Sequence, residues 1–330
     1  MSHKPIKKRS RRPFTFLFLT VAACLCLTPL SVVANSDNRD WTLKDGTRFN
    51  ADLITYNVET DHVKLRIDVN TVKEIPFTQF SAVDRAWLLE WAEFSQELAE
   101  TKAEMEGLIE RYQTEDEHKT VYYVYYPSAY AENKTLPLLF LFHPSGKGER
   151  YVQRMMLAAE VLDLIIISSD DFRNRVDGKE RFEALLPVLD KQIDYDKNRF
   201  YLGGTSGGGM CAFGFTAHFT GRHWAGVWSN GGWLGGKTHR ETDFPDGLRV
   251  AIVNGDSDLG ANRWVEHDKK ILNKHKAVIG LFAFEGGHQI PPPLIQVKSL
   301  RWLLSDAPTP DPIKPPEQDP ADELESPPSP

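Results

Sequence analysis

The sequence has few cysteines, and outside its first 34 residues it has no excess of positive charge. Two of its three cysteines, Cys24 and Cys26, lie in that segment, so Cys211 stands alone in the remainder and an intrachain disulfide is excluded there. The segment also holds six lysines and arginines and no acidic residue, so the formal net charge of −7 becomes −13 without it. A chain this acidic is poorly suited to bind nucleic acid or an anionic membrane surface. Neither is expected as a partner.

The N-terminal segment itself has the pattern of a secretory signal. Basic residues precede the apolar run 14–30, and the small-residue site Val32-Val33-Ala34 follows. We expect cleavage after Ala34 and export to the periplasm or the extracellular space. Ser10-Arg11-Arg12-Pro13-Phe14 is typical of a twin-arginine signal. Val21-Ala22-Ala23-Cys24 resembles a lipoprotein processing box, but apolar residues continue beyond it, so ordinary cleavage is favoured. The run contains a proline and is short for a stable membrane anchor.

The C-terminal segment has the opposite composition. Residues 306–330 contain nine of the 21 prolines and seven acidic residues against one lysine. Such a segment buries too little apolar surface to fold, which predicts a disordered, extended tail. The whole chain of 330 residues is 41% hydrophobic, which is enough for a large α/β domain with additions.

Residues 39–92 are predicted to form a small β module. Val63-Lys64-Leu65-Arg66-Ile67 alternates apolar and polar residues as a half-buried strand does. Asp45-Gly46 is a turn signal between two further short strands. Ser81 is a candidate N-cap for a helix over about 83–111.

The later part of that helix is rich in glutamate and lysine. This composition is typical of a solvated spacer. Residues 93–115 are therefore expected to be a helical linker between two domains.

From His118 onward, strand patterns alternate with helical patterns. This alternation predicts a doubly wound, mostly parallel sheet over residues 118–305. Expected strands are 121–126, 136–142, 164–168, 200–202, 226–229, 250–253 and 279–284. Expected helices are 150–162, 181–192, 208–218, 264–274 and 294–304.

The candidate nucleophile is Ser206 in Gly204-Thr205-Ser206-Gly207-Gly208, a G-x-S-x-G pattern between an expected strand and an expected helix. A serine hydroxyl is a weak nucleophile without an adjacent base. His288, in Glu285-Gly286-Gly287-His288 after the last strand, is the candidate base.

The imidazole in turn needs a carboxylate to hold its tautomer. Asp258 is preferred and Asp256 is the rival, because both follow the 250–253 strand. The order Ser206, Asp258, His288 is that of α/β-hydrolases and differs from the chymotrypsin and subtilisin orders.

An oxyanion intermediate needs preorganised hydrogen-bond donors. The N–H of Gly207 is one candidate, and Ser145 in His143-Pro144-Ser145-Gly146 is the other, because proline has no N–H. His143 is expected either to border the substrate or to tie down this loop. Trp233, flanked by glycine on one side, is a candidate for stacking on a sugar or aromatic acyl group.

On these residues the domain resembles the α/β-hydrolase superfamily, and within it secreted esterases of the polyhydroxybutyrate depolymerase and feruloyl esterase type. The resemblance rests on the motifs around Phe142, Ser206, Asp258 and His288. It implies ester hydrolysis through an acyl-enzyme, with a polymeric or bulky ester as the expected substrate and with no metal or organic cofactor. A serine peptidase of the same fold is the nearest alternative.

The β module resembles the Sla homology-one domain of the yeast endocytic adaptor. The matching residues are Arg39, Trp41, Gly46, Phe49, Ala51, Val63, Leu65 and Phe80-Ser81-Ala82-Val83-Asp84. The resemblance implies a protein-binding module. The second functional hypothesis is therefore a non-catalytic adaptor or surface-binding protein, with a protein partner for the module.

Overall fold

The computed structural model describes residues 37–305, with the exception of 69–70, 133, 175–177, 236–243 and 285. The expected export signal over 1–34 and the expected tail over 306–330 lie outside the described residues. Within the described part of the chain, no helix is both long and apolar enough to cross a membrane.

The small N-terminal domain is a four-stranded antiparallel sheet in chain order, followed by helix α1 (Ala82–Glu104). The strands are β1 (Asp37–Thr42), β2 (Arg48–Asn57), β3 (His62–Arg66) and β4 (Val72–Pro76). The predicted turn at Asp45-Gly46 is confirmed, because it joins β1 to β2. The predicted N-cap is also confirmed, because the Ser81 side chain accepts a hydrogen bond from the Asp84 N–H at 3.2 Å.

A buried carboxylate fastens α1 to this sheet. Asp84 is 3% exposed, and its Oδ1 accepts a hydrogen bond from the Arg39 guanidinium at 2.7 Å. Arg39 in turn lies over the rings of Trp41 and Trp87, at 4.8 and 4.5 Å from their centroids. The charge of Asp84 is thus paired, and the aromatic rings cover the cation. Arg39, Trp41 and Asp84, which belong to the sequence pattern of the β module, therefore help to hold α1 against the sheet.

The expected helix over 83–111 is correct only in part. Helix α1 ends at Glu104, and strand β5 (Leu108–Gln113) follows three residues later. This strand pairs antiparallel with β6 (Val121–Tyr126). The expected helical linker over 93–115 is therefore wrong from Leu108, where the chain already belongs to the large sheet.

The large sheet has eight strands in the order β12-β11-β10-β9-β7-β8-β6-β5. All neighbouring pairs are parallel except β5–β6 and β6–β8. The remaining strands are β7 (Leu138–Phe142), β8 (Ile165–Ser169), β9 (Phe200–Thr205), β10 (Gly226–Asn230), β11 (Arg249–Gly255) and β12 (Val278–Phe284). The predicted mostly parallel sheet is confirmed, and β6, the strand next to one edge, is antiparallel to both of its neighbours.

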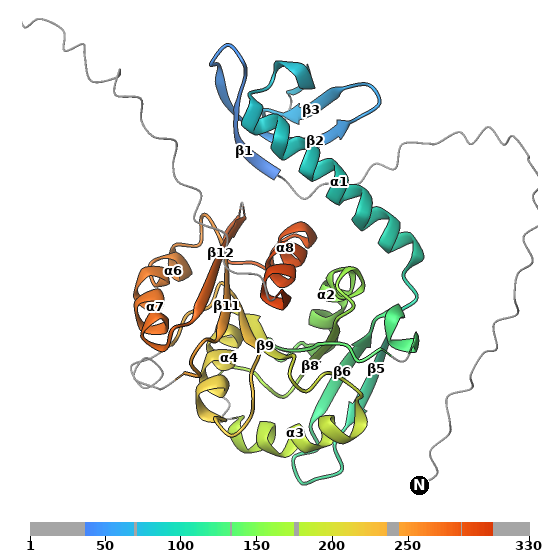
Figure 1. The fold of residues 1–330 in the computed structure, drawn as a ribbon, viewed down its shortest axis with the longest axis vertical. Coiled ribbons are helices and arrows are strands. Elements are labelled where there is room, and N and C mark those ends of the chain that lie inside the picture. Colours follow the sequence, from blue (N-terminus) through green and yellow to red (C-terminus); the bar gives the residue numbers. More distant parts are fainter. Residues whose placement is uncertain are drawn as a thin grey trace, which may run out of the picture. The chain divides into compact units, whose positions relative to one another are not determined.

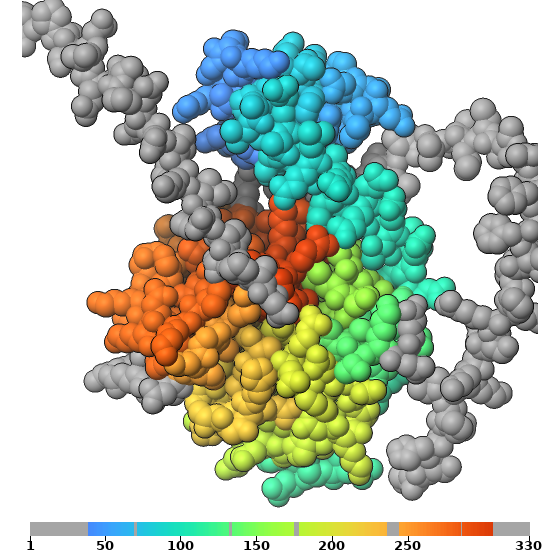
Figure 2. All heavy atoms as spheres, viewed as in Figure 1, coloured from blue at the N-terminus to red at the C-terminus, as the bar shows by residue number. Residues whose placement is uncertain are grey.

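Helices cover both faces of the sheet (Figure 1). They are α2 (Gly148–Val161), α3 (Lys179–Gln192), α4 (Gly207–His218), α6 (Leu259–Asn262), α7 (Val265–Leu272) and α8 (Pro293–Leu304). Helices α2 and α8 lie against each other on one face, where their side chains close the space between the ribbons (Figure 2).

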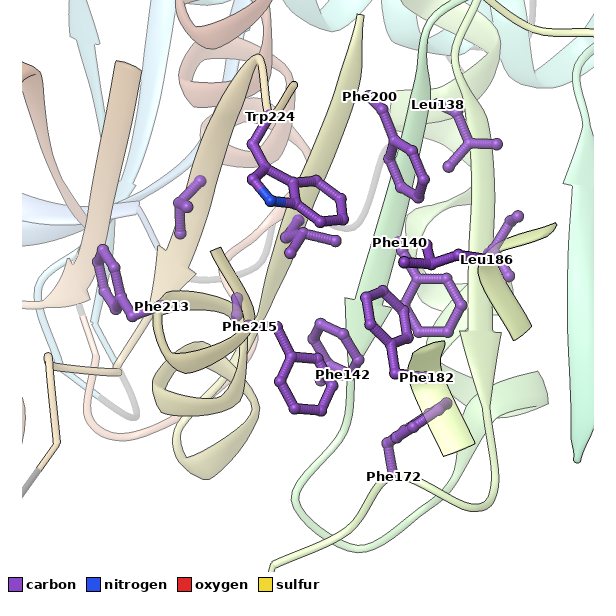
Figure 3. Packing of buried hydrophobic residues seen from close by; sticks show 14 of the residues in the cluster. Leu138, Phe140, Phe142, Phe172, Phe182, Leu186, Phe200, Phe213, Phe215 and Trp224 are labelled. Carbon is purple, nitrogen blue, oxygen red and sulfur yellow. The ribbon is translucent and has the colours of Figure 1, made fainter. Parts of the chain in front are cut away.

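The alternation of strand β7 divides the core between these two faces. Leu138, Phe140 and Phe142 pack into one cluster with residues of α3 and α4, whereas Leu139 and Leu141 pack into the other with residues of α2 and α8. The first cluster is strongly aromatic: Phe142 of β7 meets Phe182 of α3 and Phe215 of α4 edge to face, and these two rings stack on each other (Figure 3). A rigid core of this kind holds the ends of the central strands in place.

Helix α3 is tied to the loop before β10 by Asp190. Arg222 donates two hydrogen bonds to its carboxylate, at 2.8 and 2.6 Å. The Arg222 hydrogen bonds hold the pKa of Asp190 well below its usual range. A carboxylate whose pKa is lower in the folded chain stabilises the fold above its unfolded pKa of about 3.9, and loses that contribution as the pH falls through the folded value.

Asp190→Asn is therefore expected to lower the free energy of unfolding by about 1 kcal/mol at pH 7, the upper range for a half-exposed ion pair. The difference from the wild type should shrink as the pH falls below about 4. Urea unfolding of both proteins between pH 7 and pH 3 measures it. A difference that stays constant across this range would contradict the assignment.

Candidate active site

Ser206 occupies a strained turn between β9 and α4. Its backbone has φ 57° and ψ −122°, a left-handed conformation that costs energy for a residue with a side chain. The turn is held because the Ser206 N–H donates to the Asn230 carbonyl at 2.8 Å. At Gly208 a Cβ would lie 1.8 Å from the Phe142 carbonyl oxygen, so α4 can begin this close to β7 only with glycine there. A strained residue between a strand and a helix, with glycine beside it, is the geometry expected of the predicted nucleophile elbow.

The register of the parallel strands brings the other candidates to the same edge of the sheet. Thr205 is level with Asn230 on the neighbouring strand, Asn230 with Val253, and Gly255 with Phe284. The residues that follow these positions therefore emerge together at the carboxyl ends of β9, β10, β11 and β12. Open α/β sheets bind their ligands at this edge.

Asp258 and His288 are in direct contact. His288 Nδ1 lies 2.6 Å from Asp258 Oδ2, and the carboxylate side chain is 4% exposed against 45% for the imidazole. The second oxygen of Asp258 accepts the Ala261 N–H at 3.1 Å, which caps α6. The carboxylate is thus fixed from one side and faces the imidazole with the other, so Nε2 is the ring nitrogen left for a reacting group.

Asp256, the rival acid, has a different contact. Its Oδ1 accepts the Gly286 N–H at 3.0 Å, and this hydrogen bond lowers the pKa of the carboxyl group. Asp256 therefore fixes the backbone of the histidine loop, whereas Asp258 contacts the imidazole. The geometry favours Asp258, as the sequence argument did.

The dipeptide Gly231-Gly232 lies between the histidine and the serine. A Cβ at Gly231 would lie 3.1 Å from His288 Nδ1 and 3.2 Å from Asp258 Oδ2. A Cβ at Gly232 would lie 3.1 Å from the Ser206 carbonyl oxygen. Any side chain at these positions would press on the imidazole or on the elbow, so the loop after β10 keeps the site open by having none.

A buried network of hydrogen bonds supports the elbow from below. The Thr205 hydroxyl donates to Asn230 Oδ1 at 2.9 Å, and the Asn230 amide donates to the Val253 carbonyl at 3.1 Å. Tyr151 in α2 contacts the same Thr205 oxygen at 2.6 Å, and burial raises the pKa of this phenol. Because the threonine proton is directed to Asn230, Tyr151 is the donor in this contact.

The loop after β7 differs from the expected oxyanion loop. The Ser145 N–H donates to His143 Nδ1 at 3.1 Å, so in this structure it is directed to the imidazole. Burial, with Lys147 and other nearby cations, lowers the pKa of His143, and the ring also packs edge-on against Tyr151. His143 thus ties down the loop, which is the second of its two expected roles.

The tryptophan within β10 and the one in the loop after it have different environments. Trp228 is fully buried and donates to the Ser299 hydroxyl at 2.9 Å, which makes it a core residue. Trp233 is half-buried and directly follows the Gly231-Gly232 loop. Its predicted role in substrate binding stays a prediction. Cys211 is half-buried and packs against the core on the α4 face, as expected of a small hydrophobic side chain.

Acidic residues near the site have structural contacts. Asp170 accepts hydrogen bonds from the Gly148 N–H and the Tyr123 hydroxyl, and Asp171 accepts the Val121 N–H. Within the described residues, no cluster of three or more histidine, cysteine, aspartate or glutamate side chains could hold a metal ion.

Sequence reasoning missed Asn174, in the loop after β8. A Cβ at Gly207 would lie 1.9 Å from Asn174 Oδ1, so the asparagine carboxamide covers the residue after Ser206. No motif marks this asparagine, because its position depends on how the loops after β7 and β8 meet. The hydrogen bond between Thr205 and Asn230 was not predicted either, although Thr205 lies within the G-x-S-x-G motif and Asn230 directly precedes Gly231-Gly232.

Comparison with solved structures finds proteins with a similar fold at low identity. The S-formylglutathione hydrolase of Staphylococcus aureus is 14% identical, with a TM-score of 0.48, over 61% of this chain and 97% of that chain. The ferulic acid esterase of Anaeromyces mucronatus is 14% identical, with a TM-score of 0.47, over 61% of this chain and 89% of that chain. A hyperthermophilic esterase of Pyrobaculum calidifontis is 12% identical, with a TM-score of 0.48, over 64% and 86%. At such identities the likeness concerns the fold alone.

No protein-family model matches the chain, and a search of curated proteins finds no match either.

Proposed function

We propose that this protein is a serine hydrolase that cleaves carboxylic esters, with Ser206 as nucleophile, His288 as base and Asp258 as the acid that orients the imidazole. The observation that carries the proposal is the 2.6 Å contact between His288 and the buried Asp258 at the same sheet edge as the strained Ser206. Three different strands supply the three residues, in the chain order that this fold uses.

The reaction would begin when Ser206 Oγ attacks the ester carbonyl carbon and its proton passes to His288 Nε2. The resulting oxyanion is stabilised by the Gly207 N–H at the start of α4. The C–O bond to the alcohol then breaks, and the alcohol leaves with the proton from the imidazolium. A water molecule activated by His288 attacks the acyl-enzyme in turn, which releases the acid and restores Ser206.

An ester rather than an amide is the proposed substrate class, and polysaccharide-linked acyl groups or a polyester are the proposed natural examples. The preference for an ester over an amide is directly testable with small substrates. A peptidase would also cleave anilides of the same acid at a measurable rate, because its general acid can protonate an amine leaving group.

The experiment combines active-site labelling with hydrolysis by the full chain. A fluorophosphonate probe is expected to label the wild type, and Ser206→Ala should abolish labelling and hydrolysis of short p-nitrophenyl esters. Ser257→Ala is the matched control, since Ser257 is an exposed serine in the loop that carries the acid, and it should be labelled normally. A wild type that neither reacts with the probe nor hydrolyses the esters would contradict the proposal. Clear cleavage of p-nitroanilides of the same acids, abolished by Ser206→Ala, would favour the peptidase.

A further inference from the structure

The loop after β7 has few backbone N–H groups to offer an oxyanion. Pro144 has none, the Ser145 N–H donates to His143 Nδ1, and the Gly146 N–H donates to the His143 carbonyl at 3.0 Å. The backbone N–H groups of Ser145 and Gly146 therefore already have acceptors, and Pro144 has no N–H. If the Gly207 N–H stabilises the oxyanion, none of these three residues supplies a second donor beside it, and a neighbouring segment is the next place to find one.

The loop after β8 lies directly against this one. The Asn174 N–H donates to the Pro144 carbonyl at 2.9 Å, and Arg173 pairs with Ser145 in an isolated antiparallel bridge. The two loops are thus joined through their backbones. This pairing fixes the position from which the Asn174 side chain starts.

From that position the Asn174 carboxamide reaches the start of α4. A Cβ at Gly207 would lie 1.9 Å from its Oδ1, 2.7 Å from its Cγ and 2.9 Å from its Nδ2. The carboxamide therefore fills the space that a side chain after the nucleophile would occupy. Asn174 is exposed, so its position is not a consequence of core packing.

A carboxamide carries two N–H donors and no charge. Its oxygen and nitrogen are nearly the same size, and a half-turn about the Cβ–Cγ bond exchanges them. The amide group can therefore point to a developing oxyanion beside the Gly207 N–H without displacing the backbone. A neutral donor that is already in place costs little reorganisation when the charge forms.

We propose that Asn174 is a catalytic residue of this site and that its side-chain amide donates to the oxyanion together with the Gly207 N–H. The inference rests on the proposed function. It replaces the Ser145 N–H, the donor expected from the sequence, with a side chain from the neighbouring loop.

The test uses the full chain with Asn174→Ala, and Asn198→Ala as the matched control. Asn198 is also exposed, but it precedes β9 at the strand end opposite Ser206. Removal of one oxyanion donor is expected to lower kcat for a p-nitrophenyl ester by about 100-fold, with KM changed less than about threefold. The inhibition constant of an alkyl trifluoromethyl ketone, which forms a tetrahedral adduct, should rise by about the same 100-fold.

Two outcomes would overturn the inference. In the first, Asn174→Ala keeps kcat and the ketone affinity near the wild-type values while Ser206→Ala is inactive. In the second, only KM rises, which would assign Asn174 to ground-state binding. Failure of the proposed function is recognised separately, because the wild type itself would then neither hydrolyse the ester nor bind the ketone.

Asn174→Asp makes the test independent of how the alanine variant folds. The aspartate keeps the shape of the asparagine but places a negative charge beside the oxyanion, so kcat should fall further than in the alanine variant. An aspartate variant with wild-type kcat would also contradict the inference. Thermal unfolding of each variant, compared with Asn198→Ala, separates a loss of rate from a loss of fold.

Discussion

Asp258→Asn is expected to lower kcat for ester hydrolysis by about 10⁴-fold, whereas Asp256→Asn should leave it within about threefold. The reason is the way Asp258 is held. One carboxylate oxygen accepts the Ala261 N–H at 3.1 Å, and the other faces His288 Nδ1 at 2.6 Å. In the asparagine variant the amide oxygen keeps the bond to Ala261, so the NH₂ group faces the imidazole.

An NH₂ group at this place donates to Nδ1 and forces the imidazole proton onto Nε2. The nitrogen that has to take the proton of Ser206 is then already occupied, and the base is lost although the fold is kept. Steady-state kinetics with a p-nitrophenyl ester measure the loss, and an unchanged thermal midpoint shows that the helix cap survives. Asp256→Asn is the matched control because its oxygen can still accept the Gly286 N–H. A large loss in that variant with little change in Asp258→Asn would reverse the roles of the two acids.

Gly208→Ala is expected to lower the free energy of unfolding by about 3 kcal/mol or more, because the added methyl group has no space. Its carbon would lie 1.8 Å from the Phe142 carbonyl oxygen and 2.6 Å from the carbonyl carbon. Both are backbone atoms of β7, so relief requires the whole strand and α4 to separate. Helix propensity acts in the opposite direction, since alanine is favoured over glycine by about 1 kcal/mol in a helix. The clash is the larger effect.

Gly221→Ala provides the comparison, because no atom lies within 4 Å of a Cβ at Gly221 and it lies in a loop. Urea unfolding of the three proteins should therefore show a large loss of stability for Gly208→Ala and almost none for Gly221→Ala. Equal urea midpoints for Gly208→Ala and Gly221→Ala would contradict the close approach of α4 to β7 at Gly208.

The parts of the fold that could be predicted are those with a strong local pattern. The strands around Phe140 and Ile252 are continuous apolar runs, and the pentapeptide around Ser206 carries the constraints of its own turn. The candidate acid and base followed, because residues just after parallel strands meet at one edge. These features depend on neighbours in sequence or on a simple rule of topology.

The features that were predicted wrongly or missed depend on contacts that no local sequence pattern records. Strand β5 continues the charged composition of α1, and only its pairing with β6, Tyr112 opposite Tyr122, makes it a strand. The Ser145 N–H could not be known to donate to His143, because that choice is made by loop geometry. Asn174 reaches Gly207 through the contact between two loops that no sequence pattern records.

Thr205 stands at the position of the G-x-S-x-G pattern where the pattern itself allows any residue. Here its hydroxyl accepts a hydrogen bond from Tyr151 of α2 and donates one to Asn230 of β10, and all three side chains are buried. Only serine shares this pair of capacities in a side chain of comparable size. A valine, although similar in shape, would remove the hydrogen bonds that Thr205 makes with the Tyr151 hydroxyl and with Asn230 Oδ1 beneath the nucleophile. In this molecule the variable position of the motif is therefore constrained by α2 and by the neighbouring strand β10, and libraries that diversify the elbow should leave it unchanged.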